Sequence, residues 1–265
     1  MIAFETKENY TFDDLLRIME ILRAPGGCMW DREQDHRSIR RNFIEETYEV
    51  IEAIDQKDLE HMKEELGDVL LQVVFHTEME REKGNFDMDD VADGICKKLI
   101  YRHPHIFGDV KVSSSTEVLQ NWDALKRVEK SQKTTTDSME SVARSLPQLI
   151  RAEKVQHKAS KVGFDWADAA GALEKVREEV EELSRAVSGD GDPAEELGDL
   201  LFATVNVARF IKADPEQALE RASDKFIRRF AQVERAVLGS GKTLEETSLA
   251  EMDALWDSAK REETK

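Results

Sequence analysis

Two acidic motifs follow one another in this chain, and the same pair of motifs occurs a second time. The EExxE motif spans Glu45–Glu49 and again Glu178–Glu182, and an ExxD motif follows at Glu65–Asp68 and again at Glu196–Asp199. Residues three apart lie on one face of an α-helix, so each copy would present four carboxylates from two neighbouring helices. The fold must therefore accommodate the same pair of acidic helices twice.

The composition favours helices throughout the chain. Of 265 residues, only 13 are glycine and 5 are proline, while Ala, Leu, Glu, Lys and Arg are abundant, and these are strong helix formers. Hydrophobic residues make up 40% and charged residues 35%. That balance is polar for a globular protein but too apolar for a disordered one. We therefore predict an all-α fold.

Charge and cysteine content narrow the possible partners and location. The formal net charge of −18 would repel phosphate backbones, so we expect no nucleic-acid partner. The two cysteines, Cys28 and Cys96, cannot form a disulfide framework, and a reducing cytoplasm is expected. No apolar run approaches the roughly 20 residues that cross a bilayer, and residues 1–5 lack the basic start of a signal peptide. We expect no contact with a membrane.

Apolar periodicity and turn residues predict the helices. In the first half we expect helices at 12–23, 38–54, 59–81, 89–100 and 117–129, with Ser38 capping the second of them. The second half repeats the order with helices at 146–162, 172–187, 194–211, 215–238 and 245–260. Between the halves, 131–138 reads as a polar linker without helical pattern, and 102–115 reads as an ordered loop.

Two further matches strengthen the duplication. Lys98 and Arg102 correspond to Lys225 and Arg229, and a Trp–Lys pair at 122 and 126 corresponds to one at 256 and 260. The period exceeds that of any solenoid repeat. We therefore predict two tandem helical domains, at 1–130 and 145–265, joined by a linker at 131–144.

The spacing of the acids suits a divalent cation. Short connections favour antiparallel packing of the two acidic helices, which would bring each quartet together. Glu65 and Asp68 border an apolar stripe, so they would face a cleft, where several carboxylates are costly without a cation. Oxygen ligands select Mg²⁺, with Mn²⁺ as a substitute. A di-iron bundle would need two Glu-x-x-His motifs, and only Glu33–His36 has that spacing.

Each feature has an alternative interpretation when it is taken alone. A single EExxE motif is most often a solvated helix face, the Lys/Arg pairs could be surface residues, and the tryptophans could belong to the core. The recurrence of Gly67 and Gly198 inside helices adds weight to function. A mid-helix glycine costs about 1 kcal/mol relative to alanine, so we predict that a ligand or another backbone approaches closely at both.

These residues together resemble a known family. EExYE at Glu45–Glu49, EELGD at Glu64–Asp68 and Glu195–Asp199, and the RHPHIFG segment at Arg102–Gly108 are similar to MazG, in the superfamily of all-α NTP pyrophosphatases. WDREQ at Trp30–Gln34 adds to the likeness, which covers nearly the whole chain and matches the two-domain form.

The resemblance implies a reaction, a cofactor and an assembly. Members hydrolyse NTPs or dNTPs between the α- and β-phosphates, giving NMP and pyrophosphate, and they require Mg²⁺. They form homodimers in which helices of both chains complete four-helix-type cores, and a role in nucleotide-pool house-cleaning is implied. Two-domain members work mainly through the C-terminal copy, although both copies here keep the full quartet.

The resemblance also implies roles for individual residues. Metal ligands would be Glu179, Glu182, Glu196 and Asp199 in the second copy and Glu46, Glu49, Glu65 and Asp68 in the first. Glu178 and Glu45 would position water, and Glu178 would also contact the nucleotide. The other nucleotide-binding residues would be Lys175, Lys225, Arg229, Trp256 and Lys260.

Two alternative functions remain open at this point. The EExxE and ExxD motifs are shared with dimeric dUTPases, so a narrow dUTPase-like pyrophosphatase is one alternative. A helical binding or regulatory module whose acids are relics is the other.

Overall fold

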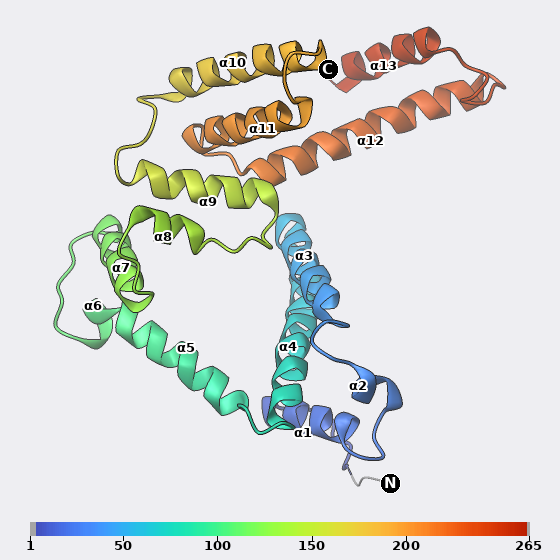
Figure 1. Cartoon of the computed structure of the whole chain (residues 1–265). Coiled ribbons are helices and arrows are strands. Elements are labelled where there is room, and N and C mark those ends of the chain that lie inside the picture. The colour runs from blue at the N-terminus through green and yellow to red at the C-terminus, as the bar shows by residue number, and fades with distance from the viewer. Residues whose placement is uncertain (1–3, 264–265) are drawn as a thin grey trace. The chain divides into compact units, whose positions relative to one another are not determined.

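The computed structural model describes residues 4–263, and within that range it consists of helices without strands (Figure 1). The all-α prediction is confirmed. The first seven helices are α1 (Phe12–Arg23), α2 (Met29–Glu33), α3 (Arg40–Gln56), α4 (Leu59–Arg81), α5 (Met88–Arg102), α6 (Pro104–Phe107) and α7 (Ser115–Glu129). The remaining six are α8 (Thr135–Glu140), α9 (Gln148–Ser160), α10 (Ala169–Val187), α11 (Pro193–Phe210), α12 (Pro215–Gly239) and α13 (Leu249–Glu263).

The chain divides into two compact units, residues 1–126 and 127–265. In the first unit α3 packs against α4, and α1 packs against the same helix. In the second unit α10 packs against α11, α9 packs against α11, and α12 packs against α13. Each acidic motif pair therefore lies on one helical hairpin, α3–α4 in the first unit and α10–α11 in the second.

The two acidic hairpins close differently. Lys57 and Asp58 alone connect α3 to α4, with Lys57 in the left-handed region at φ 58° and Asp58 capping α4 through the backbone N–H groups of Glu60 and His61. The α10–α11 connection runs over residues 188–192 and contains Gly189 at φ 104° and Gly191 at φ 124°. Glycine adopts such positive φ angles without steric cost.

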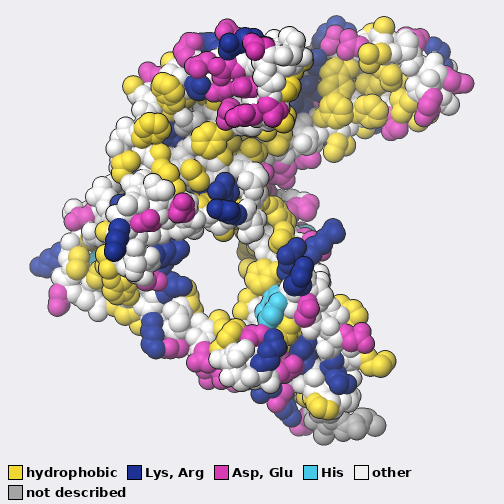
Figure 2. Space-filling view, in the orientation of Figure 1, with side chains coloured by type: hydrophobic (Ala, Val, Ile, Leu, Met, Phe, Trp, Pro, Cys, Tyr) yellow, Lys and Arg dark blue, Asp and Glu magenta, His cyan; other side chains and the backbone are white. Residues whose placement is uncertain are grey.

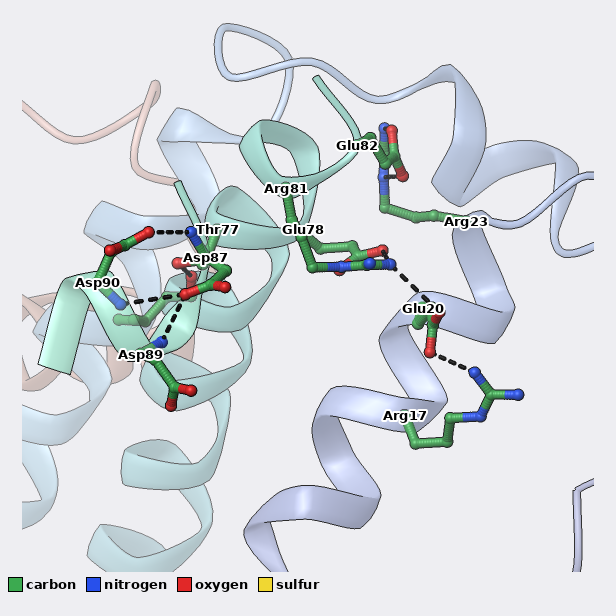
Figure 3. Close-up of polar contacts among 11 residues, drawn as sticks. Arg17, Glu20, Arg23, Thr77, Glu78, Arg81, Glu82, Asp87, Asp89 and Asp90 are labelled. Atoms are coloured by element: carbon green, nitrogen blue, oxygen red, sulfur yellow. Dashed lines mark hydrogen bonds and ion pairs between the residues drawn. The ribbon is translucent and has the colours of Figure 1, made fainter. Parts of the chain in front are cut away.

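A small apolar core holds the first unit together at the end of α4 away from the acids. Its buried members are Met19, Ile39, Val74, Phe75 and Met79. Polar contacts surround this core where α1 meets α4 (Figure 3). Arg81 bonds Glu78 at 2.6 Å and Glu20 at 3.3 Å, and Arg23 bonds Glu82 at 2.7 Å. The core residues of α4 thus lie in its second half, whereas its first half contributes Glu65 to the acidic cluster.

Three short helices and one cap differ from the sequence-based expectations. Ser38 does not cap α3, because its hydroxyl accepts from the backbone N–H of Asp35 instead and the N-cap residue is Ile39. Helix α2 lies between the expected helices 12–23 and 38–54, where no helix was predicted, and α6 lies inside the expected loop 102–115. Helix α8 lies inside the segment expected to be a linker, where Thr134 forms a reciprocal capping box with Asp137.

Among the described helices, none is both long and apolar enough to cross a bilayer.

Candidate metal and nucleotide site

The first acidic cluster joins α3 to α4. Carboxylate oxygens of Glu46, Glu49 and Glu65 all lie within 4.8 Å of one another. Glu65 is only 7% exposed. Its Oε1 contacts His61 Nε2 at 3.0 Å, while its Oε2 has no hydrogen-bond partner among residues 4–263. A buried oxygen without a partner is costly, so this atom is available to a ligand.

The second cluster joins α10 to α11 in the same way. Oxygens of Glu179, Glu196 and Asp199 lie within 4.8 Å of one another. Glu179 is 4% exposed, and its Oε2 is also without a hydrogen-bond partner in the described part of the chain. Its Oε1 lies 2.6 Å from the ammonium of Lys175, which also lies 2.8 Å from Glu178.

The fourth acid of each predicted quartet lies nearby but outside the tightest group. Burial raises the pKa of Glu46, and the negative charge of Asp68 raises it further. Burial likewise raises the pKa of Glu196, followed by the charge of Glu182. Each unit thus brings three predicted ligands into direct contact range and holds the fourth close enough to affect their charge.

The acids are more buried than the apolar residues beside them. Glu65 is 7% exposed whereas Leu66 is 49% exposed, and Glu179 is 4% exposed whereas Val180 is 50% exposed. The sequence predicted that the acids lie at the edge of an apolar stripe. In the structure the most buried acid of each hairpin lies inward, and its apolar neighbour points outward.

Both clusters fit a hard divalent cation. They consist of oxygen donors alone, and each contains a buried oxygen without a hydrogen-bond partner in residues 4–263. Mg²⁺ and Mn²⁺ prefer such donors and commonly keep positions open for phosphate oxygens. Burial also raises the pKa of Glu46, Glu65 and Glu196, which is the expected response of carboxylates withdrawn from solvent beside one another.

The prediction for the two helical glycines is not met within the chain. A Cβ built on Gly67 or on Gly198 would meet no atom of the described chain within 4 Å. Within residues 4–263, no backbone outside the helix itself therefore approaches either position. A close approach by a ligand or a second chain stays a prediction.

The basic and aromatic residues predicted to bind nucleotide form their own group in the second unit. The guanidinium of Arg229 lies 5.9 Å from the centre of the Trp256 ring, and Phe226 packs on the same ring at 5.0 Å. Arg229 also bonds Glu263 at 2.8 Å. In the first unit, Arg102 lies over Trp122 at 5.3 Å, so the duplication predicted from the sequence extends to this contact.

The structure separates this group from the acids in part. Arg229 bonds Glu263, not the carboxylates of α10 and α11, and Lys260 lies 3.2 Å from Asp257 on its own helix. Lys225 is exposed on α12. Lys175 is the predicted nucleotide-binding residue that directly contacts a predicted metal ligand, namely Glu179.

One contribution to the sites escaped the sequence-based reasoning. His61 holds Glu65 from one turn earlier on α4, and its i, i+4 spacing to that acid was the available signal. A second histidine group lies further along the first unit. His36 stacks on His76 with ring centres 5.0 Å apart and bonds Glu80 through Nε2 at 2.6 Å.

The comparisons with known proteins identify the family of this chain. The family model described as MazG nucleotide pyrophosphohydrolase domain matches twice, at residues 34–107 and 169–234. A protein of Thermotoga maritima named nucleoside triphosphate pyrophosphohydrolase/pyrophosphatase MazG is 46% identical over 94% of this chain and 95% of its own length. The nucleoside triphosphate pyrophosphohydrolase of Escherichia coli K12 is 43% identical over 95% of this chain and 97% of its own length.

A third relative contains a similar sequence within a longer protein. YabN of Bacillus subtilis, described as uncharacterized, is 46% identical over 96% of this chain. The matched region makes up 52% of the length of YabN. The double match of the family model and the near-complete coverage of the first two relatives lead to one conclusion. The chain belongs to the MazG family of nucleotide pyrophosphohydrolases, in its two-domain form.

Proposed function

We propose that this protein hydrolyses nucleoside triphosphates and deoxynucleoside triphosphates between the α- and β-phosphates, releasing the monophosphate and pyrophosphate in a reaction that requires Mg²⁺. One observation carries the proposal. Each unit contains a cluster of three carboxylates around a buried oxygen that has no hydrogen-bond partner in the described chain, and each unit also contains an Arg–Trp pair. Each unit therefore contains both cation ligands and groups suited to a nucleotide.

The second unit supplies residues for each part of the reaction. Glu179, Glu196 and Asp199 would hold the cation, with Glu182 beside them. Bound there, Mg²⁺ would neutralise phosphate charge and polarise the phosphoryl oxygens. Mn²⁺ has the same donor preference and would substitute.

Neighbouring residues would position the reactants. Glu178 lies one residue before the buried ligand and is exposed, so its carboxylate would orient the attacking water and accept its proton. Lys175 and Arg229 would neutralise phosphate oxygens, with the guanidinium able to bind two at once. Trp256 would stack on the base, with Lys225 and Lys260 nearby on α12 and α13.

We further propose that the working form is a homodimer. Large apolar side chains are exposed along the helices that carry or flank the acids, including Val180, Leu197, Leu201 and Phe226, each with 47–58% of its surface exposed. Figure 2 shows hydrophobic side chains gathered over α12 and α13, and acidic ones over α10. Contiguous apolar surface of this kind is typical of a protein–protein interface. Within one chain, Arg229 pairs with Glu263 and not with the carboxylates of the second cluster. In a dimer, a guanidinium of one chain would lie beside the carboxylates of the other.

The reaction is tested by supplying a panel of NTPs and dNTPs with Mg²⁺ and separating the products by anion-exchange chromatography. We expect monophosphate and pyrophosphate in equal amounts. Release of orthophosphate without pyrophosphate would overturn the proposal. Turnover of dUTP alone would instead support the narrower dUTPase-like function, and absence of any turnover would support a binding or regulatory module.

The role of the acids is tested by single substitutions in each copy. Glu179→Gln should abolish turnover if the second copy is the main catalytic one, and Glu46→Gln should reduce it less. Glu181→Gln serves as the matched control, because Glu181 is an exposed member of the same EExxE motif. Full activity in the combined Glu46→Gln and Glu179→Gln variant would contradict a role for the clusters. Light scattering that gives the mass of one chain would contradict the homodimer.

The proposed role and place in the cell follow from the same features. Hydrolysis of unwanted triphosphates suits nucleotide-pool house-cleaning. Cys28 and Cys96 are both free thiols in the structure, which suits the reducing cytoplasm that we propose as the location.

A further inference from the structure

The two acidic clusters differ in the group that contacts their most buried carboxylate. In the second unit that group is the ammonium of Lys175, which lies 2.6 Å from Glu179 Oε1. In the first unit the most buried acid is Glu65, and its partner is the imidazole of His61 at 3.0 Å. An ammonium always brings a positive charge, whereas an imidazole N–H donates a hydrogen bond without one.

Alignment of the two EExxE motifs shows that the lysine has no counterpart in the first copy. Glu179 aligns with Glu46, and Lys175, one turn earlier, aligns with Asn42. The two clusters thus contain the same acidic residue types, but only the second has a basic side chain four residues before the second glutamate of its motif. The duplication therefore provides an internal comparison for the charge at this position.

Lys175 takes up part of the position that a divalent cation needs. It bridges Glu178 and Glu179, so it already neutralises part of the second cluster. Glu179 is 4% exposed, and its other oxygen has no hydrogen-bond partner in the described residues. A cation that approached this oxygen would stand close to the ammonium and be repelled by it, and in a partly buried site such repulsion is weakly screened.

Lys175 can nevertheless leave Glu179. Its side chain is 34% exposed and ends a flexible four-carbon stem. A triphosphate offers the ammonium a concentrated negative charge in exchange for the carboxylates. Movement of the ammonium to the phosphates would free Glu179 Oε1 and remove the repulsion at the same time.

We propose that Lys175 is a built-in counter-ion that couples divalent-cation binding to triphosphate binding in the second cluster, whereas the first cluster binds the cation without nucleotide. The coupling rests on the proposed function in one respect, namely that the anion is a triphosphate. The difference between the clusters in the absence of nucleotide does not depend on any turnover.

The test is a titration of the full-length protein with Mn²⁺, followed by the electron paramagnetic resonance signal of the free ion. Without nucleotide, we expect the tighter sites to disappear in Glu65→Gln and to persist in Glu179→Gln. Addition of the non-hydrolysable analogue α,β-methylene-ATP should create further tight sites, and Glu179→Gln should remove those. A coupling of about tenfold or more in Mn²⁺ affinity is expected, within the usual range for linked sites.

An exchange of the two aligned residues provides the sharpest comparison. Lys175→Asn should give the second cluster tight Mn²⁺ sites without nucleotide, and Lys175→Gln should do the same with a longer amide. Asn42→Lys should weaken nucleotide-free binding at the first cluster by about tenfold or more. Lys242→Asn is the matched control, because Lys242 pairs with Glu251 at 2.8 Å in the same unit, and it should change nothing.

The possible outcomes separate this inference from the proposed reaction. Equal Mn²⁺ affinity at both clusters of the unsubstituted protein without nucleotide would overturn the inference, as would Lys175 variants that gain no affinity. Absence of pyrophosphate release, together with the expected Mn²⁺ results, would overturn only the proposed reaction. Thermal melting of each variant, compared with the unsubstituted protein, verifies that the substituted chains are folded.

Discussion

The guanidinium of Arg229 lies over the indole ring of Trp256, 5.9 Å from its centre. A guanidinium held against an aromatic face is fixed in orientation, and the ion pair of Arg229 with Glu263 at 2.8 Å fixes it further. The same relationship joins Arg102 to Trp122 in the first unit, so each unit presents an oriented guanidinium beside a flat apolar surface. That combination suits a phosphate and a base.

The first prediction concerns this pair. Arg229→Ala should lower kcat/KM by about 10- to 100-fold, the loss typical of a hydrogen bond to a charged group. KM should account for most of the change, because the residue binds substrate. Steady-state kinetics with the best substrate of the panel measure the effect. Arg102→Ala is the matched control and should change kcat/KM little if the second copy is the main catalytic one. Equal losses in the two variants would assign catalysis to both copies.

The second prediction concerns the buried acid of the first cluster. Glu65→Gln removes a charge that has little solvent around it, so the cation-free protein should unfold at a higher temperature. The same substitution should remove the gain in melting temperature that Mg²⁺ gives the unsubstituted protein, because binding to the folded state alone stabilises it. Differential scanning fluorimetry with and without Mg²⁺ measures both. Glu64→Gln, an exposed neighbour, should leave the Mg²⁺ gain intact, and a gain retained in Glu65→Gln would exclude Glu65 as a ligand.

The third prediction concerns the pH dependence of the clusters. Burial raises the pKa of Glu46, Glu65 and Glu196 above the ordinary value of 4.5. A carboxyl with a raised folded-state pKa contributes stability below its unfolded pKa and loses that contribution as the pH rises through the folded value. The Mg²⁺-induced rise in melting temperature should therefore grow from acidic to neutral pH. A rise that is independent of pH would contradict this linkage.

The fourth prediction concerns Glu80, whose pKa is shifted in the opposite direction. Hydrogen bonds from His36, Lys83 and Asn85 hold its pKa at about 2, below the ordinary value of 4.5. A lowered folded-state pKa gives stability that is present above about pH 4.5 and is lost as the pH falls toward about 2. Glu80→Gln should lower the free energy of unfolding at neutral pH and make the acid side of the stability profile flatter. Urea unfolding at a series of pH values across that range measures the free energy of unfolding. If its decrease at acidic pH is the same in the variant, other carboxylates determine that decrease.

The fifth prediction concerns Gly198. A Cβ at this position would meet nothing in the described chain within 4 Å, so with no ligand or second chain at this position Gly198→Ala should stabilise the helix by about 1 kcal/mol. Gly171→Ala provides the comparison, because its Cβ would lie 3.3 Å from the Trp166 ring, and it should stabilise less or destabilise. Chemical denaturation measures the two variants. Destabilisation by Gly198→Ala would show that a second chain or a ligand approaches the helix there.

The long helices could be predicted from the sequence because their own residues specify them. Periodic apolar positions predicted Phe12–Arg23 and Leu59–Arg81 with the ends that the structure has. The short helices α2, α6 and α8 could not be predicted this way, because four to six residues are too few for a periodic pattern. Helix α8 did carry a local signal, the capping box of Thr134 and Asp137.

The membership of the acidic clusters could be predicted, but their environment could not. Helical spacing brought together three of each quartet. The inward position of Glu65 and the exposure of Leu66 depend on which helices pack on α4, and spacing along one helix does not specify that. The partners of the two buried acids, His61 and Lys175, each lie four residues before their acid in the sequence, but that spacing does not show which acid of a cluster is the most buried.

The connections of the two hairpins give the copies different mechanical properties. Glu49 lies seven residues before the end of α3, whereas Glu182 lies five residues before the end of α10. Glu65 lies six residues after the start of α4, whereas Glu196 lies three residues after the start of α11. The carboxylates of the second cluster therefore lie closer along their helices to the connecting bend, and that bend contains two glycines. A small change in the α10–α11 bend would directly alter the distances between the carboxylates of the second cluster. The two-residue bend between α3 and α4 is shorter and lies further from the first cluster, so the same movement would change the first cluster less.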